Sequence, residues 1–146
     1  MKKGEIMRKI VIVGAGASGV YLSVLLKQKY PQDDVIVLEQ NQSPLKKLLA
    51  TGNGRCNLSN QNMDQQYYDS DNLDIVQSII QDFDMVSQMK EIGLYCLYQG
   101  HLLYPKSEQA LSVKNVLMQR AQEAGVLFLY EQEVYRIECQ NQYRIV

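Results

Sequence analysis

The chain has 146 residues, enough for one domain of ordinary size. Its 15 basic and 16 acidic residues give a net charge of −1 without a polybasic cluster, which argues against nucleic acid or an anionic membrane as partner. No run of about 18 apolar residues occurs, so no transmembrane helix is predicted. We expect a soluble, cytoplasmic protein with a small-molecule partner; the sequence indicates neither its substrate nor its oligomeric state.

The three cysteines, Cys56, Cys96 and Cys139, lack the C-x-x-C spacing of zinc and redox sites. We expect free thiols in a reducing compartment and no metal site. Cys56 is interpreted as a packing residue, because no second cysteine is near enough in sequence to resolve an oxidised thiol.

The first predicted elements form a strand, a helix and a second strand. Residues 10–13 are a continuous β-branched run, typical of a strand buried on both faces of a parallel sheet. Residues 17–29 carry apolar helical faces, and Pro31 ends that helix. Residues 35–38 repeat the buried-strand pattern and lead into Glu39. This order predicts a right-handed βαβ crossover.

The middle of the chain is predicted to alternate short helices and loops. A short helix is expected over residues 44–49, followed by a loop rich in Gly and Asn over residues 51–62. Asp71 is the predicted N-cap of a helix to about residue 80, and Asp84 of a second helix to about residue 92. No linker, repeat or low-complexity tract divides the chain.

A hairpin and the longest helix are predicted next. Residues 94–98 and 102–104 flank a turn at Gln99-Gly100. Ser107 is the expected N-cap of the long helix, and Gly125 occupies its C′ position. The apolar residues of this helix recur at helical spacing: Ala110, Val113, Leu117, Ala121 and Ala124.

Three strands are predicted to end the chain. Residues 126–129 have the pattern of a third parallel strand, whereas residues 133–139 and 143–146 are expected to pair antiparallel through a connection at 140–142. The predicted fold class is therefore α/β, a Rossmann-type parallel sheet followed by the start of an antiparallel meander.

The segment Gly14-Ala15-Gly16-Ala17-Ser18-Gly19 fits the pattern G-x-G-x-x-G directly after a predicted strand and at the start of a helix. The first glycine permits a tight turn, the second lets the backbone approach a pyrophosphate, and the third allows close helix–strand packing. N–H groups at the helix start face the phosphates. We interpret these residues as a phosphate-binding loop; the alternative is an unliganded α/β domain whose glycines serve only its turns.

Glu39 comes 20 residues after Gly19, at the end of the second predicted strand. A carboxylate at that position accepts hydrogen bonds from the ribose hydroxyls of an adenosine and repels a 2′-phosphate, which argues against NADP. Glu39 and the adjacent Gln40 are therefore candidate cofactor-binding residues. FAD and NAD share the ADP half, so these residues do not distinguish between them.

The segment KKLLATGNGRCNLSN, together with the glycine loop and Glu39, resembles the BaiN/RdsA-like family of NAD(P)/FAD-dependent oxidoreductases. A second match is GHLLYPKS, residues 100–107, followed by the helix that ends in EAGV. The resemblance implies a two-dinucleotide-binding-type flavoprotein fold with FAD on the N-terminal Rossmann unit. It also implies that the following residues contact the cofactor: Thr51, Gly52, Gly54, Arg55, Cys56 and Asn57 on the flavin side, Lys46 and Lys47 near the pyrophosphate, and the backbone of Val134 near the adenine.

The sequence departs from this family at two positions. Leu45 replaces the usual glycine before the basic pair, and His101 replaces the usual arginine after Gly100. The first departure bears on how closely that turn approaches the cofactor, and the second on a charged contact on the substrate side.

Members of this family are longer, so residues 1–146 are interpreted as the N-terminal part of a truncated FAD-binding domain, with the rest of that domain and the substrate domain absent. The first hypothesis is an FAD-dependent oxidoreductase that transfers hydride through the flavin, with NAD(P)H as candidate electron donor. No catalytic acid or base is identified in the sequence. The alternatives are a non-catalytic remnant that binds a nucleotide weakly or not at all, and a plain NAD-binding module.

Overall fold

The computed structural model describes residues 7–139 and 142–146, which form two compact units. The first unit comprises residues up to Leu48 and those from Leu117 onward, and the second comprises Leu49–Val116. Helices α2 (Lys46–Ala50) and α5 (Ala110–Glu123) contribute residues to both units. Among the described residues, no helix combines the length and the apolarity needed to cross a bilayer.

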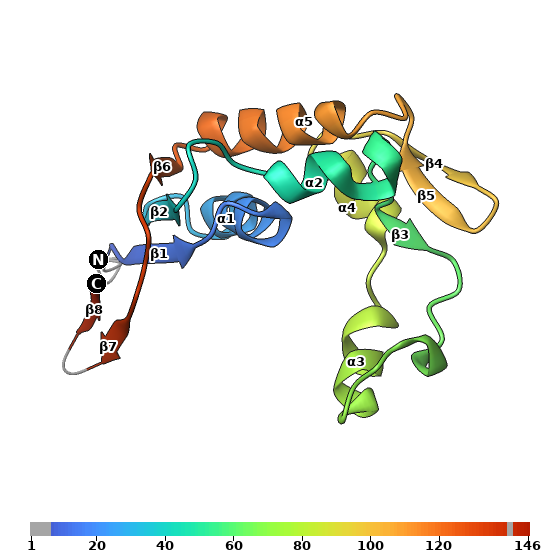
Figure 1. Ribbon diagram of the computed structural model, residues 1–146, viewed down its shortest axis with the longest axis horizontal. Helices are drawn as coiled ribbons and strands as arrows, with labels where there is room; N and C mark the ends of the chain where they lie inside the picture. Colours follow the sequence, from blue (N-terminus) through green and yellow to red (C-terminus); the bar gives the residue numbers. More distant parts are fainter. Residues whose placement is uncertain (1–6, 140–141) are drawn as a thin grey trace, which may run out of the picture. The chain divides into compact units, whose positions relative to one another are not determined.

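The first unit is built on a parallel sheet of three strands in the order β1-β2-β6 (Figure 1). These strands are β1 (Lys9–Val13), β2 (Asp34–Glu39) and β6 (Leu127–Tyr130). Helix α1 (Ala17–Lys29) connects β1 to β2. The register places Ile10 opposite Val35 and Glu39 opposite Tyr130. The predicted βαβ crossover and the third parallel strand are thus confirmed.

The core of the first unit lies between α1 and the sheet. Val20 and Val24 of α1 are at most 1% exposed, as is Val37 of β2, and Val35 is 2% exposed. Each such side chain contributes about 1.5–3 kcal/mol through burial. The carboxyl ends of β1 and β2 are therefore held rigidly, and the glycine loop and Glu39 begin there.

The second unit contains a small antiparallel sheet in the order β3-β5-β4. Its strands are β3 (Ser59–Asn60), β4 (Cys96–Gln99) and β5 (Leu102–Pro105). Two 3-10 turns, η1 (Thr51–Gly54) and η2 (Gln65–Tyr67), and two helices, α3 (Leu73–Ile80) and α4 (Met85–Glu91), complete the unit. The predicted hairpin is confirmed as β4 and β5.

The last strands form an antiparallel hairpin in the first unit, as predicted. They are β7 (Ile137–Cys139) and β8 (Tyr143–Ile145). β7 begins later than the predicted residue 133, because the backbone of residues 131 and 132 bonds the end of β2 and the segment after it instead. Arg136 still exchanges two backbone hydrogen bonds with Val146, next to the end of β8. Residues 140 and 141 of the predicted connection lie outside the described residues.

Three predicted boundaries are wrong for local reasons. The side chain of Asn72, not Asp71, caps α3 by accepting a hydrogen bond from the N–H of Ile75 at 3.2 Å. The long helix α5 begins at Ala110, because the Ser107 hydroxyl accepts from the N–H of Gln109 in a preceding turn. The hairpin turn lies at Gly100 and His101, one residue later than predicted.

Two shorter predictions also differ from the structure. The predicted helix over residues 44–49 begins at Lys46, since Leu45 has a left-handed backbone conformation. The predicted loop over 51–62 contains η1 and β3. β3 forms because it pairs with β5, a contact between residues distant in sequence.

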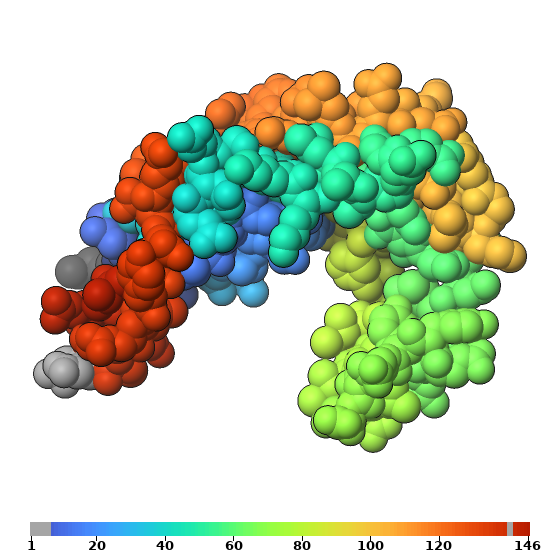
Figure 2. Space-filling view, viewed as in Figure 1, coloured from blue at the N-terminus to red at the C-terminus, as the bar shows by residue number. Residues whose placement is uncertain are grey.

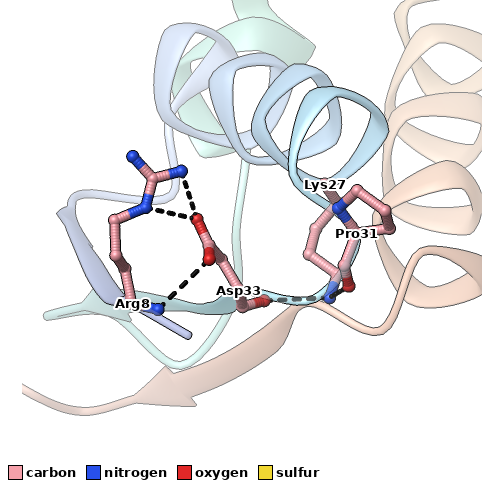
Figure 3. A network of polar contacts seen from close by, with 4 residues as sticks. All are labelled: Arg8, Lys27, Pro31 and Asp33. Carbon is pink, nitrogen blue, oxygen red and sulfur yellow. Dashed lines mark hydrogen bonds and ion pairs between the residues drawn. The ribbon is translucent and has the colours of Figure 1, made fainter. Parts of the chain in front are cut away.

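A buried carboxylate fixes the amino-terminal edge of the sheet (Figure 3). Asp33 is 0% exposed and accepts from the Arg8 backbone N–H at 3.1 Å and from Arg8 Nε at 2.8 Å. The Arg8 guanidinium also stacks over the Tyr30 ring, and Lys27 Nζ donates to the carbonyls of Pro31 and Asp33. Burial alone raises the pKa of Asp33, but the Arg8 hydrogen bonds and the charges of Arg8 and Lys27 lower it below the ordinary value.

This network predicts a stability difference that depends on pH. Because the pKa of Asp33 is lowered by folding, its contribution is present above the unfolded pKa of about 4 and is lost as pH falls through the folded value. Arg8→Gln should therefore destabilise the fold near neutral pH, where the carboxylate stays buried without its partner. The difference from the wild type should shrink as pH falls below the unfolded pKa of about 4 and Asp33 becomes protonated.

Urea denaturation at a series of pH values measures this effect. Arg8→Lys, which keeps a charge, should show a smaller loss at neutral pH. A stability difference that stays constant with pH would assign the effect of Arg8 to its stacking on Tyr30 alone.

Candidate functional site

The glycine loop turns tightly from β1 into α1. Gly14 has a φ of +99°, a left-handed conformation that L side chains rarely adopt, and its N–H donates to the carbonyl of Leu38 at 2.7 Å. Ala15 is fully buried, whereas Gly16, Ala17 and Ser18 are exposed. The loop is thus anchored at one end and open to solvent at the other.

Gly16 and Gly19 have opposite surroundings. A Cβ atom on Gly19 would overlap the carbonyl oxygen of Gly14 and press on Ile12, so this glycine permits the close approach of helix to strand. A Cβ atom on Gly16 would meet no described atom within 4 Å. Gly16 is therefore not needed for packing of the described residues, and the open space beside it is of the kind that a ligand group occupies.

The start of α1 carries the features of an anion-binding helix terminus. Gly16 is the N-cap in extended conformation and, in the described part of the chain, no side chain caps its N–H groups. The first turn of the helix has no acidic residue, and the helix runs for 13 residues to Lys29. The positive end of the helix dipole thus faces solvent at the glycine loop.

Glu39 connects the second strand to the glycine loop. Glu39 is only 8% exposed to solvent, and its Oε2 accepts from the N–H of Ala15 at 2.8 Å. Its Oε1 accepts from the backbone N–H of Asn41 at 2.8 Å and from Asn41 Nδ2 at 2.6 Å. Burial alone raises the pKa of Glu39, but the hydrogen bonds from Asn41 and Ala15 and the charge of Lys46 lower it below the ordinary value. Glu39 is therefore an ionised acceptor at neutral pH.

Two cavities meet at Glu39. The first, of about 210 Å³, is called the Glu39 cavity; it is lined by Ala15, Gly16, Glu39, Gln40, Asn41, Ser43, Leu45, Lys46 and Lys47. The second, of about 230 Å³, is called the Val134 cavity; it is lined by Val13, Gly14, Leu38, Glu39, Gln40, Gln132 and Val134. Both lie at the carboxyl ends of parallel strands, where open α/β sheets bind their ligands.

The segments after β2 and β6 lie side by side (Figure 2), and residues of both line the Val134 cavity. The N–H of Gln132 donates to the carbonyl of Glu39 at 2.9 Å, and the N–H of Glu131 donates to that of Asn41 at 3.3 Å. These backbone bonds hold Val134, which is predicted from the resemblance to lie near an adenine, at the mouth of the second cavity.

Leu45 occupies a strained position beside the glycine loop. Its φ is +62°, it is 2% exposed, and its N–H donates to the carbonyl of Ala15 at 2.9 Å. The left-handed conformation costs a non-glycine residue about 1–3 kcal/mol, and burial of the side chain offsets a similar amount. Burial of the side chain thus offsets the strain of the left-handed turn at Leu45.

The loop Thr51–Asn57 belongs to the second unit and has an unusual backbone. Gly52, Asn53, Gly54 and Cys56 all have positive φ, between +55° and +82°. A Cβ on Gly52 would meet the backbone N of Asn57 and the ring of Tyr104, whereas one on Gly54 would meet no described atom within 4 Å. Gly52 therefore serves packing, and Gly54 leaves open space.

Arg55 is engaged with the β4–β5 hairpin. Its guanidinium stacks over the Tyr104 ring at 4.4 Å and bonds Gln99 Oε1 at 3.2 Å. It also forms a 3.4 Å ion pair with Glu108. Arg55 thus fixes the loop on the hairpin. Cys56 is 4% exposed and burial raises the pKa of its thiol, so its environment is that of a packing cysteine.

The predicted site residues divide between the two units. In the first unit, the residues that line the two cavities are Gly14, Ala15, Gly16, Glu39, Gln40, Lys46, Lys47 and Val134. The residues at the start of α1, also in the first unit, are Ala17, Ser18 and Gly19. The loop of the second unit contains the others: Thr51, Gly52, Gly54, Arg55, Cys56 and Asn57.

Sequence reasoning missed Asn41 and Gln132. The available signal for Asn41 was an Asn two residues after a strand-ending carboxylate, a common setting for a side chain that bonds neighbouring backbone and side-chain groups. Gln132 contributes through its backbone, for which the sequence carries no signal.

A parallel βαβ sheet with a glycine-rich helix start and a carboxylate ending the second strand defines a Rossmann-type domain. The family described as the HI0933-like protein Rossmann domain matches residues 8–146. The chain therefore belongs to this family, which confirms the family resemblance drawn from the TGNGRCN segment.

Two curated relatives support this assignment. The 3-dehydro-bile acid delta(4,6)-reductase of Clostridium scindens is 35% identical over 114 residues, which are 76% of this chain and 28% of the relative. The ribosomal RNA dihydrouridine synthase of Escherichia coli is 26% identical over 132 residues, 87% of this chain and 32% of the relative. The chain thus spans about a third or less of the length of these relatives.

Solved structures share the fold at low sequence identity. THI4 of Thermovibrio ammonificans has a TM-score of 0.59 at 17% identity, covering 94% of this chain and 45% of THI4. BexE, studied for oxidation during BE-7585A biosynthesis, has a TM-score of 0.53 at 17% identity, covering 94% of this chain and 29% of BexE. These likenesses confirm the predicted Rossmann-type fold class.

Proposed function

We propose that this chain binds FAD through its ADP half and forms the cofactor-binding portion of an NAD(P)/FAD-dependent oxidoreductase. The observation that carries the proposal is the pairing, in one cavity, of the open space beside Gly16 with the ionised carboxylate of Glu39. A pyrophosphate needs the first, and a ribose that presents hydroxyl donors needs the second.

The residues of the first unit fit such a group. The start of α1 and the N–H groups of the glycine loop would hold the pyrophosphate, and Lys47, which lines the Glu39 cavity, would add a positive charge. Glu39 would accept from the ribose, and the Val134 cavity would receive the adenine. When bound, FAD supplies hydride and electron transfer chemistry.

The preference for FAD over NAD rests on the second unit and on the family. The loop Thr51–Asn57 is long and specific in sequence, and a plain NAD-binding module leaves it without a purpose. We propose that this loop contributes the flavin-side residues that the family resemblance implies, and that Arg55 keeps the loop in shape through Tyr104. The electron donor proposed for the whole protein is NAD(P)H.

An absorbance spectrum of the purified chain, before and after incubation with FAD and desalting, tests this function. We expect the chain to retain the visible absorbance bands of the flavin after desalting, as a consequence of tight FAD binding by this class of fold. A colourless chain that binds ADP by calorimetry would support the nucleotide site and contradict a self-sufficient flavin site. Binding of neither ligand would favour the non-catalytic remnant.

A further inference from the structure

Asn41 bridges the two charged side chains of the Glu39 cavity. Its Nδ2 donates to Glu39 Oε1 at 2.6 Å, and its Oδ1 accepts from Lys46 Nζ at 3.1 Å. Its backbone N–H donates to the same Glu39 oxygen at 2.8 Å. An asparagine amide can donate and accept at once, and here it donates toward the carboxylate and accepts from the ammonium.

We propose that Asn41 is a positioning residue for nucleotide recognition, which holds Glu39 as an ionised acceptor and keeps Lys46 on the Glu39 side of the cavity. The inference rests on the proposed function, because it gives Asn41 a role in recognition only where this cavity binds an adenosine ribose. The two lysines of the basic pair then have different roles. Lys46 bonds Asn41, which orients Glu39, and Lys47 contributes its positive charge to phosphate binding.

The geometry explains why an amide is needed at this position. A carboxylate offers about four acceptor positions, and three donors from Ala15 and Asn41 already occupy Glu39. About one position remains for a ligand hydroxyl, so its direction is set by the protein donors. An aspartate in place of Asn41 would put a second carboxylate against Glu39, and an alanine would remove both the side-chain donor and the tether of Lys46.

The charged and titratable groups around Glu39 come from two further elements, α2 and β6. Lys46 and Lys47 lie on α2 and line the same cavity, and Tyr130 of β6 is close enough that burial and the charge of Glu39 together raise its pKa. Among these residue types, only carboxylates titrate below about pH 6 in model peptides. Glu131 follows β6 and also carries a carboxylate, which accepts from Gln42. The part of the acid loss of binding that is absent from a Glu39→Gln variant therefore reports the protonation of Glu39, and removal of the Asn41 side chain should raise the pKa of Glu39.

The test compares the wild-type chain with Asn41→Ala, using ADP-ribose as probe because neither of its phosphates has a second ionisation. The adenine of the probe is its only group that gains a proton at the acid end, and it does so equally for every variant. Calorimetry from about pH 3 to pH 8 covers the range below the ordinary carboxyl pKa and should show a Kd about tenfold higher for the variant at neutral pH.

The acid limb is the range of falling pH over which affinity for ADP-ribose is lost, and its midpoint should lie at higher pH in the variant than in the wild type. Carbon-13 NMR of the Glu39 carboxyl in the unliganded chain should show a higher pKa of Glu39 in the variant than in the wild type. Gln42→Ala, which removes a neighbouring side chain bonded only to Glu131 among the described contacts, is the matched control and should bind as the wild type.

The outcomes separate this inference from the proposed function. Suppose that the wild type binds ADP-ribose. The role of Asn41 alone would be overturned if Asn41→Ala bound equally well. It would also be overturned if the variant lost the same affinity at every pH while the Glu39 titration stayed as in the wild type. A wild type that binds neither ADP-ribose nor FAD would overturn both.

Two further variants keep the test decisive if Asn41→Ala fails to fold. Asn41→Ser keeps a small polar side chain but loses the amide that donates to Glu39. The midpoint of its acid limb should therefore also move to higher pH, and an unmoved midpoint would overturn the role of Asn41. Glu39→Gln has no titratable group at this position, so its acid limb should be clearly smaller than that of the wild type and reflect the adenine of the probe. An acid limb in Glu39→Gln as large as that of the wild type would show that another group controls the pH dependence, and the inference would fail.

Discussion

Gly16→Val should abolish nucleotide binding while leaving the fold intact. Gly16 has an extended backbone with φ of −76°, which valine adopts readily, and a Cβ there meets no described atom within 4 Å. The added methyl groups would fill the space that we assign to the pyrophosphate. We expect the Kd for ADP to rise at least about a hundredfold, equivalent to about 2.7 kcal/mol.

Calorimetry with ADP and FAD measures the loss, and a thermal melt followed by circular dichroism measures the fold. The melt should stay close to that of the wild type, because Gly16 contributes no packing among the described residues. Gly19→Ala is the opposite control: its Cβ would overlap the carbonyl of Gly14, so it should lower the stability of the fold itself. Unchanged affinity in a folded Gly16→Val protein would remove the phosphate-loop assignment.

Local signals in the sequence were sufficient to predict the βαβ unit. The β-branched runs of β1 and β2 and the glycine spacing depend on residues within about 30 positions of one another, a span typical of a βαβ unit. The roles of Gly14 and Gly19 followed from the same spacing, and their surroundings in the structure agree with it. Glu39 was likewise placed correctly at the end of its strand.

The features that were not predicted depend on contacts between distant residues. β3 is a strand only because Ser59 pairs with Leu103, and Arg55 meets Tyr104, which is 49 positions away. The left-handed backbone of Leu45 is also invisible to propensity, because it is imposed by burial and by the hydrogen bond to Ala15. Asn41 was missed for a different reason, because its contacts to Glu39 and Lys46 are local and its sequence signal indicates only a turn.

Glu39→Ala tests the second half of the nucleotide site and should act in two ways. The variant loses the acceptor for the ribose hydroxyl, which costs about 1–3 kcal/mol of binding free energy. It also releases the N–H of Ala15, so the glycine loop keeps the Gly14 bond to β2 but loses the Ala15 bond. The Kd for ADP should therefore rise by at least about tenfold, and the loss should exceed that of Asn41→Ala.

The same variant should change which nucleotide is preferred. In the wild type, the Glu39 carboxylate repels a 2′-phosphate, so ADP should bind more tightly than adenosine 2′,5′-bisphosphate. Without that carboxylate, Lys46 and the amide of Asn41 remain beside the cavity and are donors suited to a phosphate. The ratio of the two Kd values should move toward the 2′-phosphate in Glu39→Ala, and competition calorimetry measures it directly. If the ratio stays as in the wild type while both ligands still bind, Glu39 does not face the ribose, and the adenosine half must lie elsewhere on the sheet edge.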